Sequence, residues 1–150
     1  MKISKYLSVK RIKIGLDGIN KKATLAELID ILQEEDLSID KDAALQALLA
    51  REKLGTTGIG HGIAIPHAKL ESMKDISVVL GISHKGINFK SLDGEPVYIV
   101  LLFLVAPTSA GDHLKVLAKV SRLLKDRFLR EELKKRLTAE EIIRLIKDKE

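Results

Sequence analysis

The 150-residue sequence contains no cysteine and no tryptophan, and aromatic residues make up only 3% of it. Without cysteine the protein forms no disulfide, binds no metal through thiolates and uses no cysteine nucleophile. The scarcity of aromatic side chains argues against a surface on which nucleic-acid bases stack. The formal net charge is +5, but lysine and arginine are interleaved with acidic residues along the chain. We therefore predict a slightly basic, solvated surface and no nucleic-acid partner.

Long hydrophobic runs are also missing. The apolar run Tyr98–Ala106 is far shorter than the roughly 20 residues that a membrane-spanning helix needs. The opening residues, MKISKYLSVKRIKI, contain no apolar stretch of the kind found in a signal peptide. We therefore expect a cytoplasmic protein that is not embedded in a membrane. Its length and its 45% hydrophobic content are typical of one domain with a substantial core, which we place at residues 1–150.

Common cofactor motifs are absent as well. The glycines of the segment Gly58–Gly62 alternate as G-x-G-x-G, which is not the G-x-G-x-x-G of dinucleotide-binding folds, and no G-x-x-x-x-G-K-[ST] occurs. His61 and His67 have no third ligand at a recognisable spacing, and no H-E-x-x-H is present. We therefore predict neither a cofactor nor a metal site.

Strand-like and helix-like segments alternate along the chain, which favours an α/β fold with helices packed on a buried sheet. The continuous apolar run from Tyr98 indicates a central strand buried on both faces. Asp40, Ser109 and Thr138 are predicted to begin helices, the last two through S/T-x-x-D/E capping sequences. The predicted strands are Arg11–Asp17, Ile63–His67, Ser77–Ser83 and Tyr98–Ala106. The predicted helices are Thr24–Glu34, Lys41–Leu54, Ser109–Lys125 and a last one that opens at Thr138, after the segment Asp126–Leu137.

Two histidines fall where such a fold places ligands. His67 is predicted just past a strand, after Pro66, and His113 in the first turn of the helix after the central strand. If the two strands run parallel, both histidines share the sheet edge at which open α/β sheets bind ligands. At that edge one imidazole could attack a phosphoryl group as the nucleophile, while the other donates a hydrogen bond to a phosphoryl oxygen. We expect His113 to lie on the protein surface.

The residues alone leave other side chains ambiguous. Arg51 lies near the end of its predicted helix, where it can stabilise the helix C-terminus or reach into the glycine segment to hold phosphate oxygens. Position alone favours the helix-terminus role. His84 lies in a polar stretch, Ser83-His84-Lys85-Gly86, and is expected to face solvent.

Three stretches carry a family resemblance: AREKLGTTGIGHGIAIPHAKL, GINFKSLDGEPVYIVLLFLVAP and DHLKVLAKVSRLLKD. They resemble the enzyme IIA domains of the bacterial phosphoenolpyruvate-dependent phosphotransferase system, in the fructose/mannitol class. The resemblance implies an α/β fold with a mixed sheet of about five strands flanked by helices. It also implies that His67 carries the phosphoryl group on Nε2, that His113 assists and that Arg51 stabilises the phosphate. Ala68 departs from the glycine that is frequent at that place in the family.

The resemblance further implies a relay without metal or nucleotide. Phosphorylated HPr, itself a phosphohistidine protein, would donate to His67, and the group would pass to a IIB partner or remain as a signal. The form T-G-I-G-H-G, which includes His61, resembles the nitrogen-regulatory members more closely, and no IIB or IIC segment accompanies the chain. Both features favour a regulator acting on a target protein. The alternative is a sugar-specific component that serves uptake.

Overall fold

A computed structural model describes residues 2–150, apart from the side chains of Ser109 and Ala110. Its helices and strands alternate much as the sequence predicts. The strands are β1 (Ile12–Ile14), β2 (Gly58–Gly60), β3 (Ile63–Ala64), β4 (His67–Lys69), β5 (Ser77–Ile87) and β6 (Val97–Val105). The α-helices are α1 (Lys21–Glu35), α2 (Lys41–Lys53), α3 (Ala110–Leu124), α4 (Arg127–Leu133) and α5 (Ala139–Lys149), and short 3-10 helices span Ile3–Tyr6, Val9–Arg11 and Pro107–Ser109.

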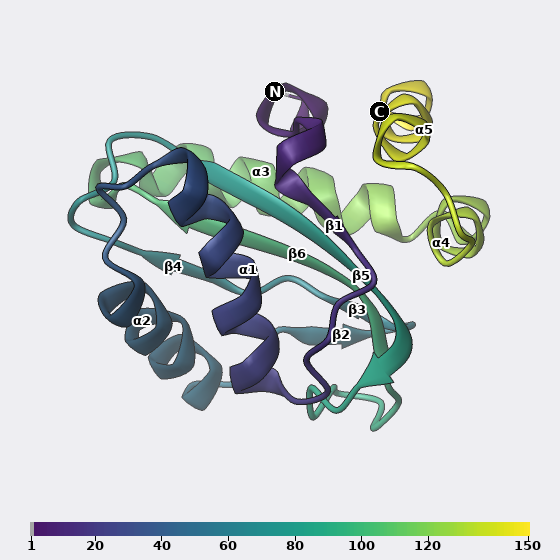
Figure 1. Ribbon diagram of the computed structural model, residues 1–150, viewed down its shortest axis with the longest axis horizontal. Coiled ribbons are helices and arrows are strands. Elements are labelled where there is room, and N and C mark those ends of the chain that lie inside the picture. Colours follow the sequence, from purple (N-terminus) through teal and green to yellow (C-terminus); the bar gives the residue numbers. More distant parts are fainter. Residues whose placement is uncertain (1) are drawn as a thin grey trace.

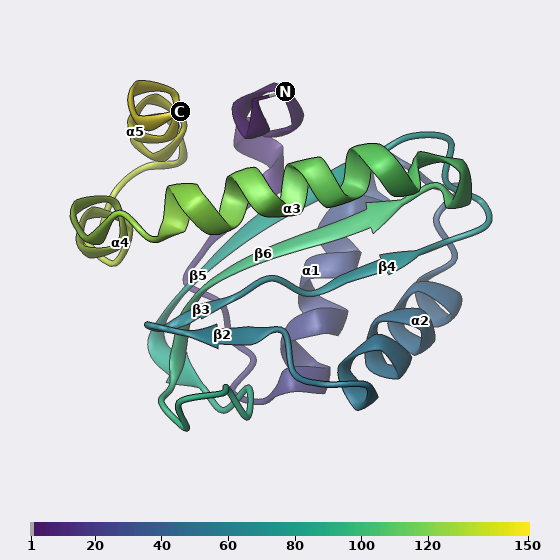
Figure 2. The same ribbon diagram turned by 180° about the vertical axis from the view of Figure 1, so that it is seen from behind.

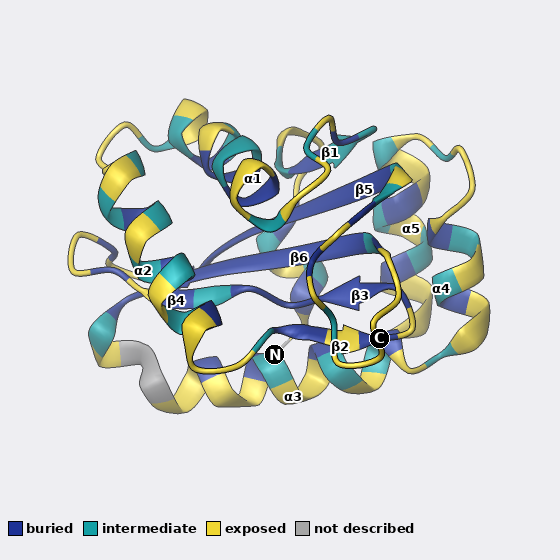
Figure 3. Ribbon diagram, turned by 90° about the horizontal axis from the view of Figure 1, so that it is seen from below, coloured by how far each residue is buried: buried dark blue, intermediate teal, exposed yellow. Residues whose placement is uncertain are grey.

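The sheet lies between two layers of helices (Figures 1 and 2). Helices α1 and α2 cover one face, and α3, α4 and α5 cover the other. Strand β6 is buried on both faces (Figure 3), as its continuous apolar run predicts. Its side chains alternate: Ile99, Leu101, Phe103 and Val105 join the core on the α3 side, whereas Val100, Leu102 and Leu104 join the core on the α1 side.

The strand directions confirm the predicted mixed sheet, whose order is β1-β5-β6-β3-β2 with β4 also paired to β6. Strand β6 runs antiparallel to β5 and parallel to both β3 and β4. Strands β3 and β4 therefore follow one another along the same edge of β6. The strand that His67 opens runs parallel to the central strand, which is the condition under which His67 and His113 share one edge of the sheet.

One predicted strand is divided in two. The sequence suggests a single strand over Ile63–His67, but pairing stops after Ala64 and resumes at His67. Pro66 lies in the gap, where its missing N–H removes a ladder donor, while its carbonyl accepts from the Phe103 N–H at 2.9 Å. His67 therefore opens a strand rather than following one, which was not predicted.

The helix starts largely follow their predicted caps. The Asp40 side chain accepts from the Ala43 N–H, and Thr138 forms a complete capping box with Glu141. Helix α1 begins three residues before the predicted Thr24, because the Asn20 side chain accepts from the Ala23 N–H and caps it earlier. The predicted cap at Ser109 falls on a side chain outside the described part of the structure.

Two segments differ from expectation. Strand β5 continues to Ile87, so His84 is a half-buried strand residue rather than part of a solvent-facing polar segment. Strand β2 was not predicted, because glycine is disfavoured in strands. Gly58 is needed there, since a Cβ would come within 2.5 Å of the Ser91 Oγ. The β2–β3 turn then passes through His61 at φ 57°, between two glycines that also have positive φ.

Candidate functional site

Three predicted residues from distant parts of the chain meet at one edge of the sheet. Arg51 comes from the last turn of α2, His67 opens β4, and His113 lies in the first turns of α3. The rings of His67 and His113 have centroids 5.1 Å apart and planes at 60°. Arg51 Nε lies 3.3 Å from His67 Nε2. Figure 2 shows β4 running between α2 and the start of α3, which explains why these side chains converge.

The His67 ring is held in one orientation. Its Nδ1 lies 2.8 Å from the Ile65 carbonyl oxygen. A carbonyl only accepts hydrogen bonds, so the proton resides on Nδ1 and the lone pair on Nε2. Arg51 Nε–H, which only donates, faces that lone pair. The arrangement presents Nε2 as the nucleophilic atom of the ring.

Arg51 makes the helix-terminus contact that its sequence position favours, and it also reaches the His67 ring. Its Nη1 donates to the Gly55 carbonyl at 2.9 Å, just past the end of α2, which is the contact with the helix C-terminus. Its Nε meanwhile reaches His67. The two contacts are compatible because the guanidinium presents its donors as a fork. The helix end therefore fixes the group that faces the histidine.

His113 is buried, with 8% of its surface exposed, so the expectation of a surface position is wrong. Helix α3 packs over the sheet and turns this residue inward to His67. Its Nε2 is buried and has no hydrogen-bond partner among the described residues. A buried polar nitrogen without a partner is costly, and here it belongs to a ring that lies beside the ring of His67.

Burial lowers the pKa of His67 below its usual value, and the positive charge of Arg51 lowers it further, while the bond to Ile65 and the carboxylate of Glu52 oppose the shift. Burial also lowers the pKa of His113, with further lowering by His67 and Lys69. Both imidazoles are therefore mostly neutral at pH 7. A neutral His67 has the free lone pair that nucleophilic attack requires.

The rim of the site is apolar and open. A cavity of about 490 Å³ lies over His67 and is lined by Ala47, Ala50, Arg51, Leu54, His67, Ala68, Lys69 and His113. Leu54 is 84% exposed and Leu114 is 68% exposed. An exposed leucine in an apolar rim, here Leu54, is typical of a surface that another protein covers. No cluster of ligands for a metal ion occurs among the described residues.

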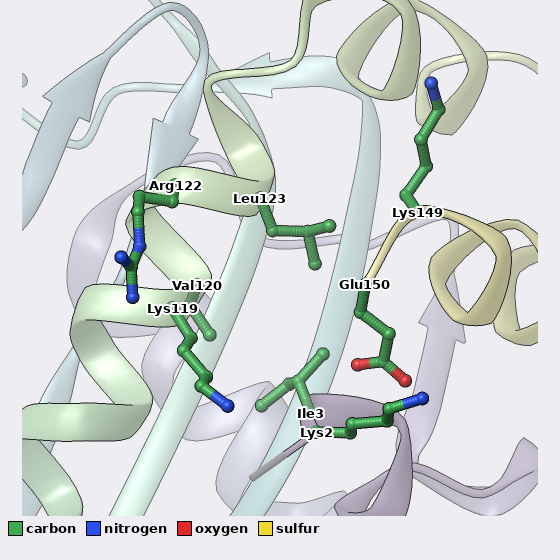
Figure 4. Close-up of a pocket in the computed structure, with 8 residues that line it drawn as sticks. All are labelled: Lys2, Ile3, Lys119, Val120, Arg122, Leu123, Lys149 and Glu150. Carbon is green, nitrogen blue, oxygen red and sulfur yellow. The ribbon is translucent and has the colours of Figure 1, made fainter.

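The other histidines stay away from this site. His61 is exposed, its N–H bonds the Asp93 carboxylate at 3.0 Å, and it lines separate cavities beside α4 and α3. A further cavity of about 370 Å³ lies where the N-terminal 3-10 helix, α3 and the end of α5 meet (Figure 4). Its labelled side chains include no histidine. In the described chain, no helix is both long and apolar enough to cross a membrane.

Sequence reasoning missed two residues behind the site. Glu52 is a buried carboxylate with 7% of its surface exposed, and Thr57 is 4% exposed. Glu52 follows Arg51 directly, so its place beside a candidate site residue was the only available signal. Glu52 is covered by α1, which packs against α2 and supplies Lys21. No local sequence pattern reveals a contact between these two helices.

Comparison with known proteins identifies similar chains. The family model for the phosphoenolpyruvate-dependent sugar phosphotransferase system, EIIA 2, matches residues 5–149. A nitrogen regulatory protein of Bradyrhizobium diazoefficiens is 40% identical over 135 residues, which cover 89% of this chain and 87% of that protein. A fructose-specific EIIABC component of Bacillus subtilis is 35% identical over 137 residues, which cover 91% of this chain but only 21% of that protein. The crystal structure of the nitrogen regulatory protein IIA-Ntr from Neisseria meningitidis superposes with a TM-score of 0.90 at 30% identity, covering 96% of this chain and 98% of that one.

Proposed function

Because the chain belongs to the EIIA 2 family of the phosphoenolpyruvate-dependent sugar phosphotransferase system, we propose that it carries a phosphoryl group on Nε2 of His67. One observation supports this choice of atom above the others. The Ile65 carbonyl holds Nδ1 at 2.8 Å, which leaves Nε2 as the ring nitrogen with a lone pair, at an edge where Arg51 and His113 converge.

The donor in this proposal is the phosphocarrier HPr, phosphorylated on its own histidine. The lone pair of His67 Nε2 attacks phosphorus in line, the new P–N bond forms as the donor's P–N bond breaks, and the donor imidazole keeps the electron pair of the broken bond. No water, metal or nucleotide takes part, because the phosphoryl group arrives already activated. The exposed Leu54, which lines the cavity over His67, suits the close contact between proteins that excludes water.

Arg51 and His113 stabilise the group during transfer. The guanidinium that faces Nε2 at 3.3 Å can turn its N–H donors to the incoming phosphoryl oxygens, where negative charge is concentrated. The unpartnered Nε2 of buried His113 gains a partner when its N–H donates to another of these oxygens. Both residues assist in this proposal, and neither carries the phosphoryl group.

The physiological role we propose is that of a phosphorylation-state regulator. Support comes from the similarity to the nitrogen regulatory protein of Bradyrhizobium diazoefficiens, which the chain covers over 87% of its length, and from the fit to the IIA-Ntr structure. The phosphoryl group would add nearly two negative charges and three acceptor oxygens beside an apolar rim. A target fitted to the uncharged rim would bind differently by roughly 1–3 kcal/mol, or about 5–150-fold.

A sugar-specific role is the second candidate. It is favoured by the 35% identity to the fructose-specific EIIABC component of Bacillus subtilis, although the chain corresponds to only 21% of that protein. In that role His67 would pass the group onward to a IIB domain. The chemistry at His67 is the same in both roles, and only the recipient differs.

Phosphorylation itself is tested by incubating the protein with phosphoenolpyruvate, enzyme I and HPr. We expect one acid-labile phosphoryl group, detected as a mass increase of one phosphoryl unit that disappears on brief acid treatment. Omitting HPr should abolish it. An unmodified protein in the complete mixture would contradict the proposed function.

The regulatory and sugar-specific roles are distinguished by offering the protein both kinds of recipient, a regulatory target protein and a IIB domain. The phosphorylated and unphosphorylated proteins are immobilised in parallel and exposed to lysate of the source cells, and phosphoryl transfer to purified IIB domains is timed. A regulator retains a partner outside the transport system in one phosphorylation state only. Rapid transfer to a sugar-specific IIB, with no such partner, would establish the transport role instead.

A further inference from the structure

An ion pair between a buried carboxylate and a partly buried lysine lies next to the candidate site. Glu52, the residue after Arg51, has only 3% of its side chain exposed and pairs with Lys21 Nζ at 3.0 Å. Its carboxylate also accepts from the Thr57 N–H at 3.0 Å and from the Thr57 hydroxyl. Lys21 is itself held over the ring of Phe89, 4.9 Å from the ring centroid. Three donors converge on the two oxygens of one carboxylate, which is the pattern of a fully satisfied, ionised group.

This carboxylate fixes the loop that holds Arg51. Glu52 lies in the last turn of α2, while Thr57 lies just before β2, so the bonds between them close the loop at residues 54–57. The Gly55 carbonyl in that loop accepts from Arg51 Nη1 at 2.9 Å. The same guanidinium places its Nε 3.3 Å from His67 Nε2. A shift of the loop would therefore move the group that faces the nucleophilic nitrogen.

A second chain of hydrogen bonds leads to the other ring nitrogen. The Thr57 carbonyl accepts from the Ile65 N–H at 3.0 Å. The Ile65 carbonyl in turn accepts from His67 Nδ1 at 2.8 Å. Thr57 therefore connects Glu52 to the peptide that sets the tautomer and the ring plane of His67. Both nitrogens of the candidate nucleophile are linked to the same buried carboxylate.

From these contacts we infer that Glu52 is a positioning residue: with Lys21 and Thr57 it holds Arg51 at Nε2 and Ile65 at Nδ1 of His67. It does not contact the phosphoryl group. Burying a charge pair seldom adds net stability, so an ion pair at this place is better explained by the geometry that it imposes. Displacement of a reacting group by about 1 Å is enough to slow a reaction by about 100-fold. The inference rests on the proposed function for its kinetic consequence, though its structural consequence is independent.

The main test is Glu52→Gln. The amide keeps the shape of the side chain but loses the negative charge that pairs with Lys21. It also places a donor where a carboxylate oxygen accepted from the Thr57 hydroxyl. We expect phosphoryl acceptance from phosphorylated HPr to slow by about 10–100-fold, by analogy with the loss seen when a group that orients a metal ligand is removed. In an Arg51→Ala background the same change should slow transfer less, because only the chain through Ile65 remains to be lost. Equal effects in both backgrounds, or a wild-type rate in Glu52→Gln, would overturn the inference.

A readout without phosphorylation separates this inference from the proposed function. Nitrogen NMR of the His67 ring reports whether the proton resides on Nδ1 alone or on either nitrogen. We expect one tautomer in the wild-type protein and a mixture in Glu52→Gln. If the wild-type protein accepts no phosphoryl group but the tautomer still depends on Glu52, the proposed function fails while the positioning role stands. A tautomer unchanged in Glu52→Gln would remove the positioning role.

Matched variants distinguish positioning from general stability. Glu27 also uses its carboxylate to hold a loop, accepting from the Asp17 and Gly18 N–H groups, so Glu27→Gln makes the same change away from the site. It should lower the melting temperature and leave the transfer rate and the His67 tautomer unchanged.

If Glu52→Gln does not fold, Thr57→Val should slow transfer by about 2–10-fold, the loss of one hydrogen bond, while Thr57→Ser restores the rate. Equal rates in these two Thr57 variants would also refute the inference.

Discussion

His61 and His67 occupy the two ends of one short segment, GHGIAIPH, in very different surroundings. His61 is exposed in a left-handed turn, and its backbone N–H is anchored to Asp93. His67 opens a strand, has both ring nitrogens engaged and faces a second imidazole. The comparison teaches that the chemistry of a histidine here depends on what α2 and α3 bring to it, and hardly on its local sequence.

Exchange of each histidine in turn gives the sharpest form of this comparison. We expect His67→Ala to abolish the acid-labile phosphoryl group completely, because no other described nitrogen is oriented in the same way. His61→Ala should be phosphorylated at the wild-type rate. Intact-mass measurement after incubation with phosphoenolpyruvate, enzyme I and HPr decides the matter. Phosphate that persists in His67→Ala, or that maps to His61, would reverse the assignment.

The neighbours of His67 should matter next. Arg51→Ala and His113→Ala are each expected to slow transfer by roughly 10²–10³-fold, as when one donor to a developing negative charge is lost. Because His113 is buried, its replacement should also lower the free energy of unfolding by about 1–3 kcal/mol. Rapid-quench measurement of the phosphorylated fraction gives the rates.

His84→Ala is the control for these two variants, since it removes a half-buried histidine of β5 that lies outside the site. It should lose stability and keep its transfer rate. Unchanged transfer in both Arg51→Ala and His113→Ala would mean that the convergence at β4 has only a structural role.

Lowering the pH should reduce the free energy of unfolding, because His67 and His113 are buried. Burial lowers the pKa of His67 and of His113, so the unfolded chain, with pKa values near 6.5, binds protons that the folded protein does not. The stability contributed by the neutral rings is complete above about pH 6.5 and is lost as the pH falls toward the lowered values. Urea denaturation between about pH 7.5 and 5 should show a steeper loss for the wild-type protein than for His67→Ala. Parallel curves for the two proteins would contradict this account.

The smallest change in stability is expected for a substitution at His61, in the turn between β2 and β3. His61 has a φ of 57°, a conformation that disfavours a side chain by about 1–2 kcal/mol. His61→Gly should remove this strain but lose part of the gain to the freedom of the unfolded chain, for a net stabilisation of about 0.5–1 kcal/mol. Chemical denaturation measures it, and phosphoryl transfer should not change. A loss of stability would mean that the imidazole makes contacts that offset the strain.

Much of the fold could be predicted from local signals. The alternation of strands and helices, the buried β6 and the caps at Asp40 and Thr138 follow from hydrophobic periodicity and hydrogen-bonding side chains. Strand β2 and the break at Pro66 did not follow, because the first depends on close packing against Ser91 and the second on pairing with β6. The buried position of His113 was mistaken for the same reason, since the direction in which a helix faces is set by the sheet it covers.

The sequence determined which groups were available: the candidate nucleophile His67 after Pro66, the candidate partners His113 and Arg51, and the absence of cysteine for any competing chemistry. A residue's chemical type is local information, and so are periodicity and capping. Only the tertiary structure decided that Arg51 meets Nε2, that His113 is buried beside it and that Glu52 is joined to Lys21 and Thr57. These contacts form between segments far apart in the chain, and their geometry exists only once β4 has paired with β6 and α2 and α3 have packed on either side.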